Sequence, residues 1–126
     1  MSKQIVQTDK APAPIGPYNQ AIRANGFLFV SGQVAIVPET GALETTTIRA
    51  ETHQVMKNIQ AILGEAKLDF SHIVKTTIFL SDMNLFASVN EIYGSYFTGA
   101  YPARETVAVK GLPKGVNVEI SVTAVG

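Results

Sequence analysis

Two spacings of apolar residues divide the chain into predicted helices and strands. Between residues 47 and 63, apolar side chains recur every three or four positions, and most positions between them are polar. This spacing is typical of an amphipathic helix that buries one face. A second helix is predicted over residues 85–97, with Asp82 or Asn84 near its N-cap. The apolar stripe of this second helix consists of Phe86, Val89, Tyr93, Tyr96 and Phe97.

Five other segments predict β-strands, because β-branched and aromatic residues dominate them or because apolar and polar residues alternate. Between the first two, Ser31-Gly32-Gln33 predicts a bulge or a turn. The proline-rich stretch Ala11–Pro17 excludes a helix or a regular strand, since proline lacks a backbone N–H. The predicted strands are residues 27–30, 34–37, 73–80, 104–110 and 116–125.

The predicted order, β-β-α-β-α-β-β, indicates an α+β fold with two helices on one face of a sheet. No repeat, charge block or linker divides residues 1–126, so we expect a single domain. The opposite face has no helical cover, and a chain of this length buries little core alone. We therefore expect that face to form a subunit contact in a homo-oligomer. Its residues should include Thr77, Phe79, Thr106, Ala108 and the polar row of the last strand.

Composition and charge exclude several classes of protein. The 10 Lys and Arg residues balance the 10 Asp and Glu residues, whereas a surface for nucleic acid or anionic lipid needs a basic excess. Hydrophobic residues make up 46% of the chain and charged residues 16%, which excludes disorder. No apolar run approaches the ~20 residues of a membrane span, and the N-terminus lacks a signal peptide. We expect a soluble, cytoplasmic protein.

The absence of cysteine removes a further set of chemistries. Such a chain has no disulfide, no thiol nucleophile and no thiolate metal ligand. His53 and His72 lie in different predicted elements without the spacing of metal ligands, so we predict no metal site.

Arg104 is the first candidate for chemistry. It begins a predicted strand directly after Pro102, and a guanidinium offers a rigid, always-charged fork for a carboxylate or phosphate. The alternative is a surface arginine paired with Glu105 or Glu119. Glu119 lies on the polar side of the last predicted strand, where it is either a solvated residue or a partly desolvated carboxylate able to transfer a proton.

Three further candidates each have a purely structural alternative. Tyr18 follows the rigid Pro17 and either presents its hydroxyl to a cleft or packs. Lys75 is either a catalytic amine or an exposed strand residue, and Ser31-Gly32 is either part of a site or simply a bulge. The residues themselves thus support an oligomeric α+β domain with a candidate anion site around Arg104.

Several segments, taken in order, resemble the reactive intermediate deaminase family, also called RidA or YjgF-type. The resemblance covers nearly the whole chain. It depends on several motifs that occur in the same order as in the family, within a chain of similar length. These motifs are Ala11–Gln20 with its Ile-Gly-Pro-Tyr core, Ser31–Gln33, Ile73–Leu80, Phe86–Asn90 followed by Tyr93, Pro102–Arg104, Leu112–Lys114 and Val118–Ile120.

The resemblance implies a chorismate-mutase-like α+β fold assembled as a homotrimer. Three sheets would form a central β-barrel with helices outside, and a ligand site would lie in each cleft between subunits. The activity it implies is hydrolysis of reactive 2-imino acids, such as 2-iminopropanoate and 2-iminobutanoate, and of their enamine tautomers. Pyridoxal-phosphate-dependent serine and threonine dehydratases release these compounds, and the products are 2-keto acids and ammonia.

The same resemblance assigns roles to residues. Arg104 would bind the substrate carboxylate, and Glu119 would orient the attacking water and pass a proton to the departing nitrogen. No cofactor or metal is implied, because a protonated imine is already electrophilic. The substrate-binding residues would be Tyr18, Ser31, Gly32, Asn90, Thr106 and Lys75.

Two residues depart from the family pattern. Most members carry a small residue directly after the arginine and a cysteine one position further on, where this chain has Glu105 and Thr106. Thr106 should share the strand face of Arg104 and line the pocket, which predicts retained binding with altered affinity or substrate preference. Glu105 should point to the other face; if it turned toward Arg104, it would neutralise the carboxylate clamp.

Other functions compete with the enzymatic one. A trimer that binds small carboxylates without turnover, or that regulates a partner protein, is the main alternative, and the family is credited with translation-inhibiting and chaperone-like roles. Zero net charge disfavours ribonuclease activity and makes a nucleic-acid partner improbable. A pericyclic mutase would share only the fold, and fold does not carry function.

Overall fold

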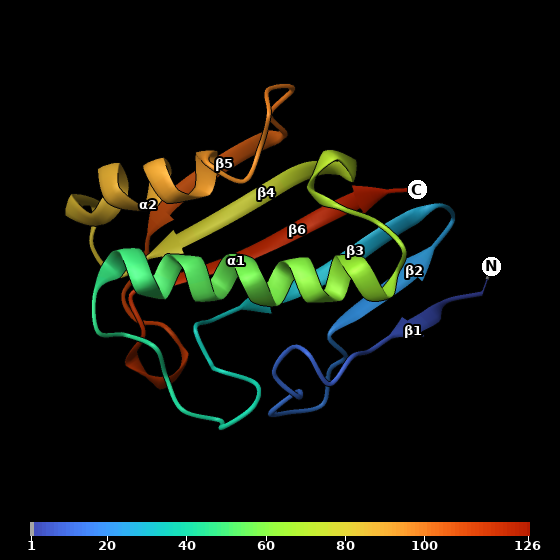
Figure 1. Ribbon diagram of the computed structural model, residues 1–126, viewed down its shortest axis with the longest axis horizontal. Coiled ribbons are helices and arrows are strands. Elements are labelled where there is room, and N and C mark those ends of the chain that lie inside the picture. The colour runs from blue at the N-terminus through green and yellow to red at the C-terminus, as the bar shows by residue number, and fades with distance from the viewer. Residues whose placement is uncertain (1) are drawn as a thin grey trace.

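The strands form a single six-stranded sheet, and both α-helices lie on one of its faces (Figure 1). A computed structural model describes residues 2–126. The strands are β1 (Gln4–Val6), β2 (Ala21–Ala24), β3 (Phe27–Gln33), β4 (Ile73–Leu80), β5 (Ala103–Ala108) and β6 (Val118–Val125). The α-helices are α1 (Ile48–Glu65) and α2 (Phe86–Gly94), and three short 3-10 turns are η1 (Phe70–His72), η2 (Met83–Leu85) and η3 (Pro113–Gly115).

The strand order is β1-β2-β3-β6-β4-β5, so the C-terminal strand lies in the middle of the sheet. Among the described strands, β4 and β5 form the only parallel pair. Parallel neighbours need a crossover connection, and α2 provides it. The α+β sheet with two helices on one face, as predicted from the sequence, is confirmed.

Helix α1 provides much of the helical cover. Thr47 caps it, because its hydroxyl accepts a hydrogen bond from the Ala50 N–H at 3.0 Å. The helix predicted over residues 47–63 is confirmed. Its apolar stripe packs on the sheet, and the apolar side chains of α1 with 1% exposure or less are Val55, Met56, Ile59, Ile62 and Leu63.

Helix α2 is shorter than the predicted segment 85–97. The chain first makes the 3-10 turn η2, which Asp82 caps by accepting a hydrogen bond from the Asn84 N–H at 2.8 Å. The α-helix then ends at Gly94, because the Ser95 N–H turns back to the carbonyls of Glu91 and Ile92. The aromatic side chains of residues 96 and 97 still pack against the core.

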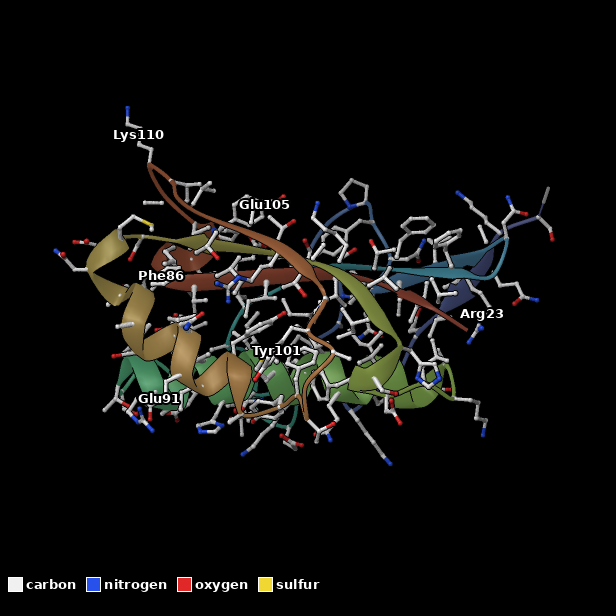
Figure 2. The ribbon with its side chains drawn as sticks, turned by 90° about the horizontal axis from the view of Figure 1, so that it is seen from above. Arg23, Phe86, Glu91, Tyr101, Glu105 and Lys110 are labelled. Atoms are coloured by element: carbon white, nitrogen blue, oxygen red, sulfur yellow. The ribbon has the colours of Figure 1, made fainter. Side chains whose placement is uncertain are left out.

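The second face of the sheet has no helix on it (Figure 2). Apolar side chains are exposed there, including Phe29 at 49% and Val107 at 43%. The polar row of β6 also points to this side, because Val118, Ile120 and Val122 are buried under the helices and alternate residues face the other way.

The predicted placement of Thr106 and Ala108 on the uncovered face is wrong. In the parallel register Thr106 pairs with Ile78 and Ala108 with Leu80, both of which are buried under the helices. Paired residues of adjacent strands project to the same side of a sheet. Thr77 and Phe79 do lie on the uncovered face, since they alternate with the buried residues of β4.

The predicted strand over residues 34–37 is also wrong. The pairing of β3 with β6 is irregular between Val30 and Gln33, so the predicted bulge is confirmed, and the chain then leaves the sheet. Beyond it, Ile36 forms only an isolated bridge with Leu43. The carbonyl groups of Val34 and Ile36 instead accept hydrogen bonds from the Asn58 side chain of α1. Strands β1 and β2 were not predicted.

No helix within residues 2–126 has the length and apolarity that crossing a membrane would require.

Candidate functional site

Strand β5 directs Arg104 toward helix α2. Its Nη1 donates a hydrogen bond to Asn90 Oδ1 at 2.7 Å. The guanidinium carbon lies 5.6 Å from the ring centre of Phe86 and 5.3 Å from that of Tyr93, both within cation–π range. These contacts hold the guanidinium in place, and among residues 2–126 no carboxylate forms an ion pair with it.

A pocket of about 460 Å³ lies beside this arginine. Burial raises the pKa of the Tyr93 hydroxyl, which donates a hydrogen bond to Thr76 Oγ1 at 2.9 Å. The positive charge of Arg104 therefore has no negative neighbour and faces space large enough for a small anion. The lining residues are Asn90, Tyr93, Gly94, Tyr101, Pro102 and Arg104.

Thr106 lies two residues after Arg104 on the same side of β5, as the sequence predicted. It was also predicted to line the Arg104 pocket, but it is not among the residues that do so. Its Oγ1 is the one buried side-chain polar atom of residues 2–126 without a hydrogen-bond partner. An unpartnered buried hydroxyl costs free energy unless a ligand or a second chain supplies the partner.

Glu119 lies in β6 on the uncovered face, opposite to the helices. Burial raises the pKa of its carboxyl above the ordinary value. The carboxylate lies against Gly32, where an added Cβ would be 2.5 Å from Glu119 Oε2. A small pocket of about 50 Å³ beside it is also lined by Tyr18, Pro12 and Pro113. Gly32 is thus required for the close approach of the carboxylate rather than for an unusual φ.

Tyr18 and Ser31 lie next to this pocket. The Tyr18 ring is 47% exposed, and its hydroxyl accepts a hydrogen bond from the Ile15 N–H at 3.3 Å. Ser31 donates its hydroxyl to the Asn19 carbonyl at 2.6 Å and its N–H to the Gln20 carbonyl at 2.9 Å. The donors of Ser31 are therefore engaged within the chain, whereas Tyr18 presents an open ring face.

Lys75 lies apart from both groups. Its Nζ is 3.1 Å from Glu105 Oε1, and Thr77 donates a hydrogen bond to Glu105 Oε2 at 2.8 Å. The Thr77 hydrogen bond and the Lys75 ammonium lower the pKa of Glu105. Glu105 is exposed on the face of β5 opposite to Arg104, so it does not neutralise the guanidinium.

The two predicted catalytic residues do not meet within one chain. Arg104 pairs in register with the buried Thr76, which places it on the helix side, whereas Glu119 pairs with Phe79 on the uncovered side. Strand β4 also lies between β5 and β6. The chain therefore carries two separate halves: an arginine half, in which Asn90 contacts Arg104, and a carboxylate half, in which Tyr18 and Gly32 lie beside Glu119.

Some of the lining residues were not predicted from the sequence. Tyr93 belonged to the expected helix stripe and is indeed buried, but it also lines the Arg104 pocket. Tyr101 is 64% exposed in the segment before β5 and carried no periodic signal. The histidines have other partners: His53 contacts the Tyr96 hydroxyl and His72 contacts Asp69.

We expect Glu119→Gln to change the pH dependence of stability. Because burial raises the folded pKa, the folded state binds more protons than the unfolded state between pH 4.5 and the raised folded value. The contribution of protonated Glu119 to the free energy of unfolding is fully present below pH 4.5. It is lost as the pH rises through the folded pKa of this carboxyl. Urea unfolding from about pH 4 to about pH 7 should show the variant gaining stability relative to wild type. Parallel pH curves for the two proteins would contradict the prediction.

Comparisons with known proteins identify the family. Residues 8–126 match the family model described as Endoribonuclease L-PSP. A mouse protein named 2-iminobutanoate/2-iminopropanoate deaminase is 46% identical over 123 residues, which cover 98% of this chain and 91% of that protein. The chain belongs to the RidA/YjgF family. A further relative is Reactive Intermediate Deaminase A, chloroplastic, of Arabidopsis thaliana, 45% identical over 98% of this chain and 66% of that protein.

Solved structures similar to this RidA/YjgF family member have the same fold. A Rid family protein of Yersinia pestis is 49% identical with a TM-score of 0.96, over 99% of this chain and 100% of that chain. The YjgF gene product of E. coli is 40% identical with a TM-score of 0.92, over 97% and 98% of the two chains. E. coli TdcF, solved with bound serine, is 36% identical with a TM-score of 0.93, over 98% of each chain.

Proposed function

We propose that this protein is a cytoplasmic deaminase that hydrolyses reactive 2-imino acids, and their enamine tautomers, to 2-keto acids and ammonia. One observation carries the proposal: Arg104 is held by Asn90 and two aromatic rings, has no carboxylate partner, and faces a pocket of about 460 Å³. A small monocarboxylate fits this charge and space. The name of the mouse relative supports the choice of reaction.

Arg104 would bind the substrate carboxylate through two parallel N–H···O hydrogen bonds. Such a pair fixes the neighbouring C2 atom, which is the carbon of the imine, at one position relative to the protein. The Thr106 hydroxyl lies on the same side of β5 and would gain its missing hydrogen-bond partner from the bound substrate. Tyr93 and Asn90 keep the guanidinium oriented.

Glu119 would act on the water that attacks C2. Its carboxylate accepts a proton from this water as the oxygen bonds to C2, which gives a tetrahedral carbinolamine. The same carboxyl then returns the proton to the nitrogen, and the C2–N bond breaks as the C2–O bond becomes a carbonyl. The carboxylate takes up the hydroxyl proton in this step and passes it to the departing ammonia, which leaves as ammonium. The raised pKa of Glu119 suits a group that must both accept and donate a proton near neutral pH.

The site would be completed by a second copy of the chain. Arg104 and Glu119 lie on opposite faces of one sheet, so a substrate of a few heavy atoms cannot contact both in one subunit. We propose a homotrimer in which the uncovered faces meet around a central barrel and each cleft joins Arg104 of one subunit to Glu119 of another. Tyr18, Ser31 and Gly32 would border the cleft beside Glu119, while Lys75 and Glu105 would lie inside the barrel.

A coupled assay tests the proposed function. A threonine dehydratase generates 2-iminobutanoate from threonine, semicarbazide captures the imine that survives, and the semicarbazone absorbance is followed with and without the purified protein. We expect the protein to suppress semicarbazone formation and to raise free 2-ketobutyrate by the same amount. Without semicarbazide, the final yield of 2-ketobutyrate should be the same with and without the protein. An unchanged semicarbazone trace would reject the deaminase. If 2-ketobutyrate nevertheless binds in calorimetry, the protein is a carboxylate-binding module without turnover.

A further inference from the structure

Glu51 is a fully buried carboxylate outside the two halves of the site. It lies in the first turn of α1 and is 0% exposed. Among residues 2–126 no cation forms an ion pair with it. Buried carboxylates are costly unless hydrogen bonds satisfy their oxygen atoms, so the position of this side chain calls for specific partners.

The partners of Glu51 are the two residues that precede Glu119. Oε2 accepts hydrogen bonds from the N–H groups of Asn117 at 2.7 Å and Val118 at 3.1 Å. Oε1 accepts one from Asn117 Nδ2 at 2.9 Å. One side chain of α1 thus holds two successive backbone positions at the start of β6.

The sheet itself leaves this part of β6 short of support. The pairing of β3 with β6 ends at Ile120, because its partner Gln33 is the last residue of β3. From Val118 to Glu119 only β4 pairs with β6. The Glu119 carboxylate lies beside Gly32 in the bulge, and beyond Gln33 no strand of residues 2–126 pairs with β6 on the β3 side.

We propose that Glu51 is a positioning residue, which replaces the missing strand contacts and so holds the Glu119 carboxylate against Gly32. It does not touch the substrate. The importance of Glu51 for catalysis rests on the proposed function, in which Glu119 orients the attacking water and transfers the proton. The acceptor geometry of Glu51, rather than its charge, does the positioning.

Direct titration of Glu119 tests this role without reference to activity. The protein is labelled with ¹³C-glutamate, and the carboxyl signal of Glu119 is assigned by its absence in Glu119→Gln. The chemical shift of this signal is then followed against pH, and the midpoint of the curve is the pKa of Glu119. We expect Glu51→Ala to lower this midpoint toward that of an ordinary glutamate, because the loosened strand end exposes the carboxylate. Tyr18 is the only other titratable side chain lining the small pocket in the described part of the chain.

Two further variants separate positioning from a loss of stability. Glu51→Gln retains an oxygen for both backbone N–H groups, and its amide can pair with a rotated Asn117 amide, so the Glu119 midpoint should stay near the wild-type value. Ile59→Ala leaves a cavity in the same helix, at a residue that is 0% exposed, and should also leave the midpoint unchanged. The proposal would be overturned if folded Glu51→Ala kept the wild-type titration midpoint of Glu119. It would also be overturned if Ile59→Ala shifted this midpoint as much as Glu51→Ala does.

Activity provides the second readout. In the coupled assay, Glu51→Ala should lower kcat by between about 10-fold and about 100-fold and move the acidic limb of the pH profile to lower pH. If Glu51→Ala does not fold, Glu51→Asp takes its place: its carboxylate is one methylene shorter, and the same downward shift in the Glu119 midpoint is expected. An inactive wild type would reject the proposed function, while the titration would still decide the role of Glu51.

Discussion

Arg104→Ala is expected to lower the kcat/KM of imine hydrolysis by roughly 30-fold to several thousand-fold, because a charge-assisted carboxylate clamp contributes about 2–5 kcal/mol. The variant loses the guanidinium that Asn90 and the rings of Phe86 and Tyr93 hold beside the pocket. Arg104→Lys should recover little of the rate, since an ammonium lacks the planar fork that binds both carboxylate oxygens. The semicarbazide assay measures both variants.

Arg49→Ala is the matched control for this loss. Arg49 also reaches helix α2, where it pairs with Glu91 at 3.4 Å, but its side chain is 53% exposed and does not line the Arg104 pocket. Exposed pairs of this kind contribute about 1 kcal/mol or less to stability. Wild-type activity is expected for Arg49→Ala. If Arg104→Ala also keeps wild-type activity, the Arg104 guanidinium does not bind the substrate carboxylate.

The elements predictable from the sequence were those whose pattern repeats over many residues. Helix α1 buries a stripe that runs from residue 51 to residue 63, and β6 alternates over its whole length, so local pattern and tertiary packing agree there. Strand β1 has three residues, which is too short for alternation to stand out. Residues 34–37 have a strand-like composition, but the bulge at Ser31–Gln33 directs them out of the sheet.

The sequence indicated candidate site residues but not how they are arranged. Arg104 stands out because it begins a predicted strand after Pro102, and Glu119 because it lies between two β-branched residues; both signals are local. Which side of the sheet each one faces depends on the register of β5 and β6 against β4, and pairing between distant segments leaves no local trace. The same reason explains why Thr106 was expected on the wrong face.

Gly32→Ala is expected to abolish most of the activity while leaving the fold intact. The added Cβ would lie 2.5 Å from Glu119 Oε2 and 2.9 Å from its Cδ, so the carboxylate must move away. A flexible side chain moves at little cost, and stability should change by about 1 kcal/mol or less. A displaced catalytic carboxylate, however, lowers kcat by up to about 100-fold. The coupled assay and urea unfolding measure the two effects separately.

Gly64→Ala is the control that makes this contrast decisive. Gly64 lies in α1, and an added Cβ there meets no atom within 4 Å. Alanine in a helix interior stabilises by about 0.5–1 kcal/mol relative to glycine, so this variant should be slightly more stable and fully active. The close contact of Gly32 with Glu119, rather than the loss of a glycine, would then account for the lost activity. If Gly32→Ala keeps the wild-type rate, the position of Glu119 against Gly32 is irrelevant to catalysis, and the water must be activated by another group.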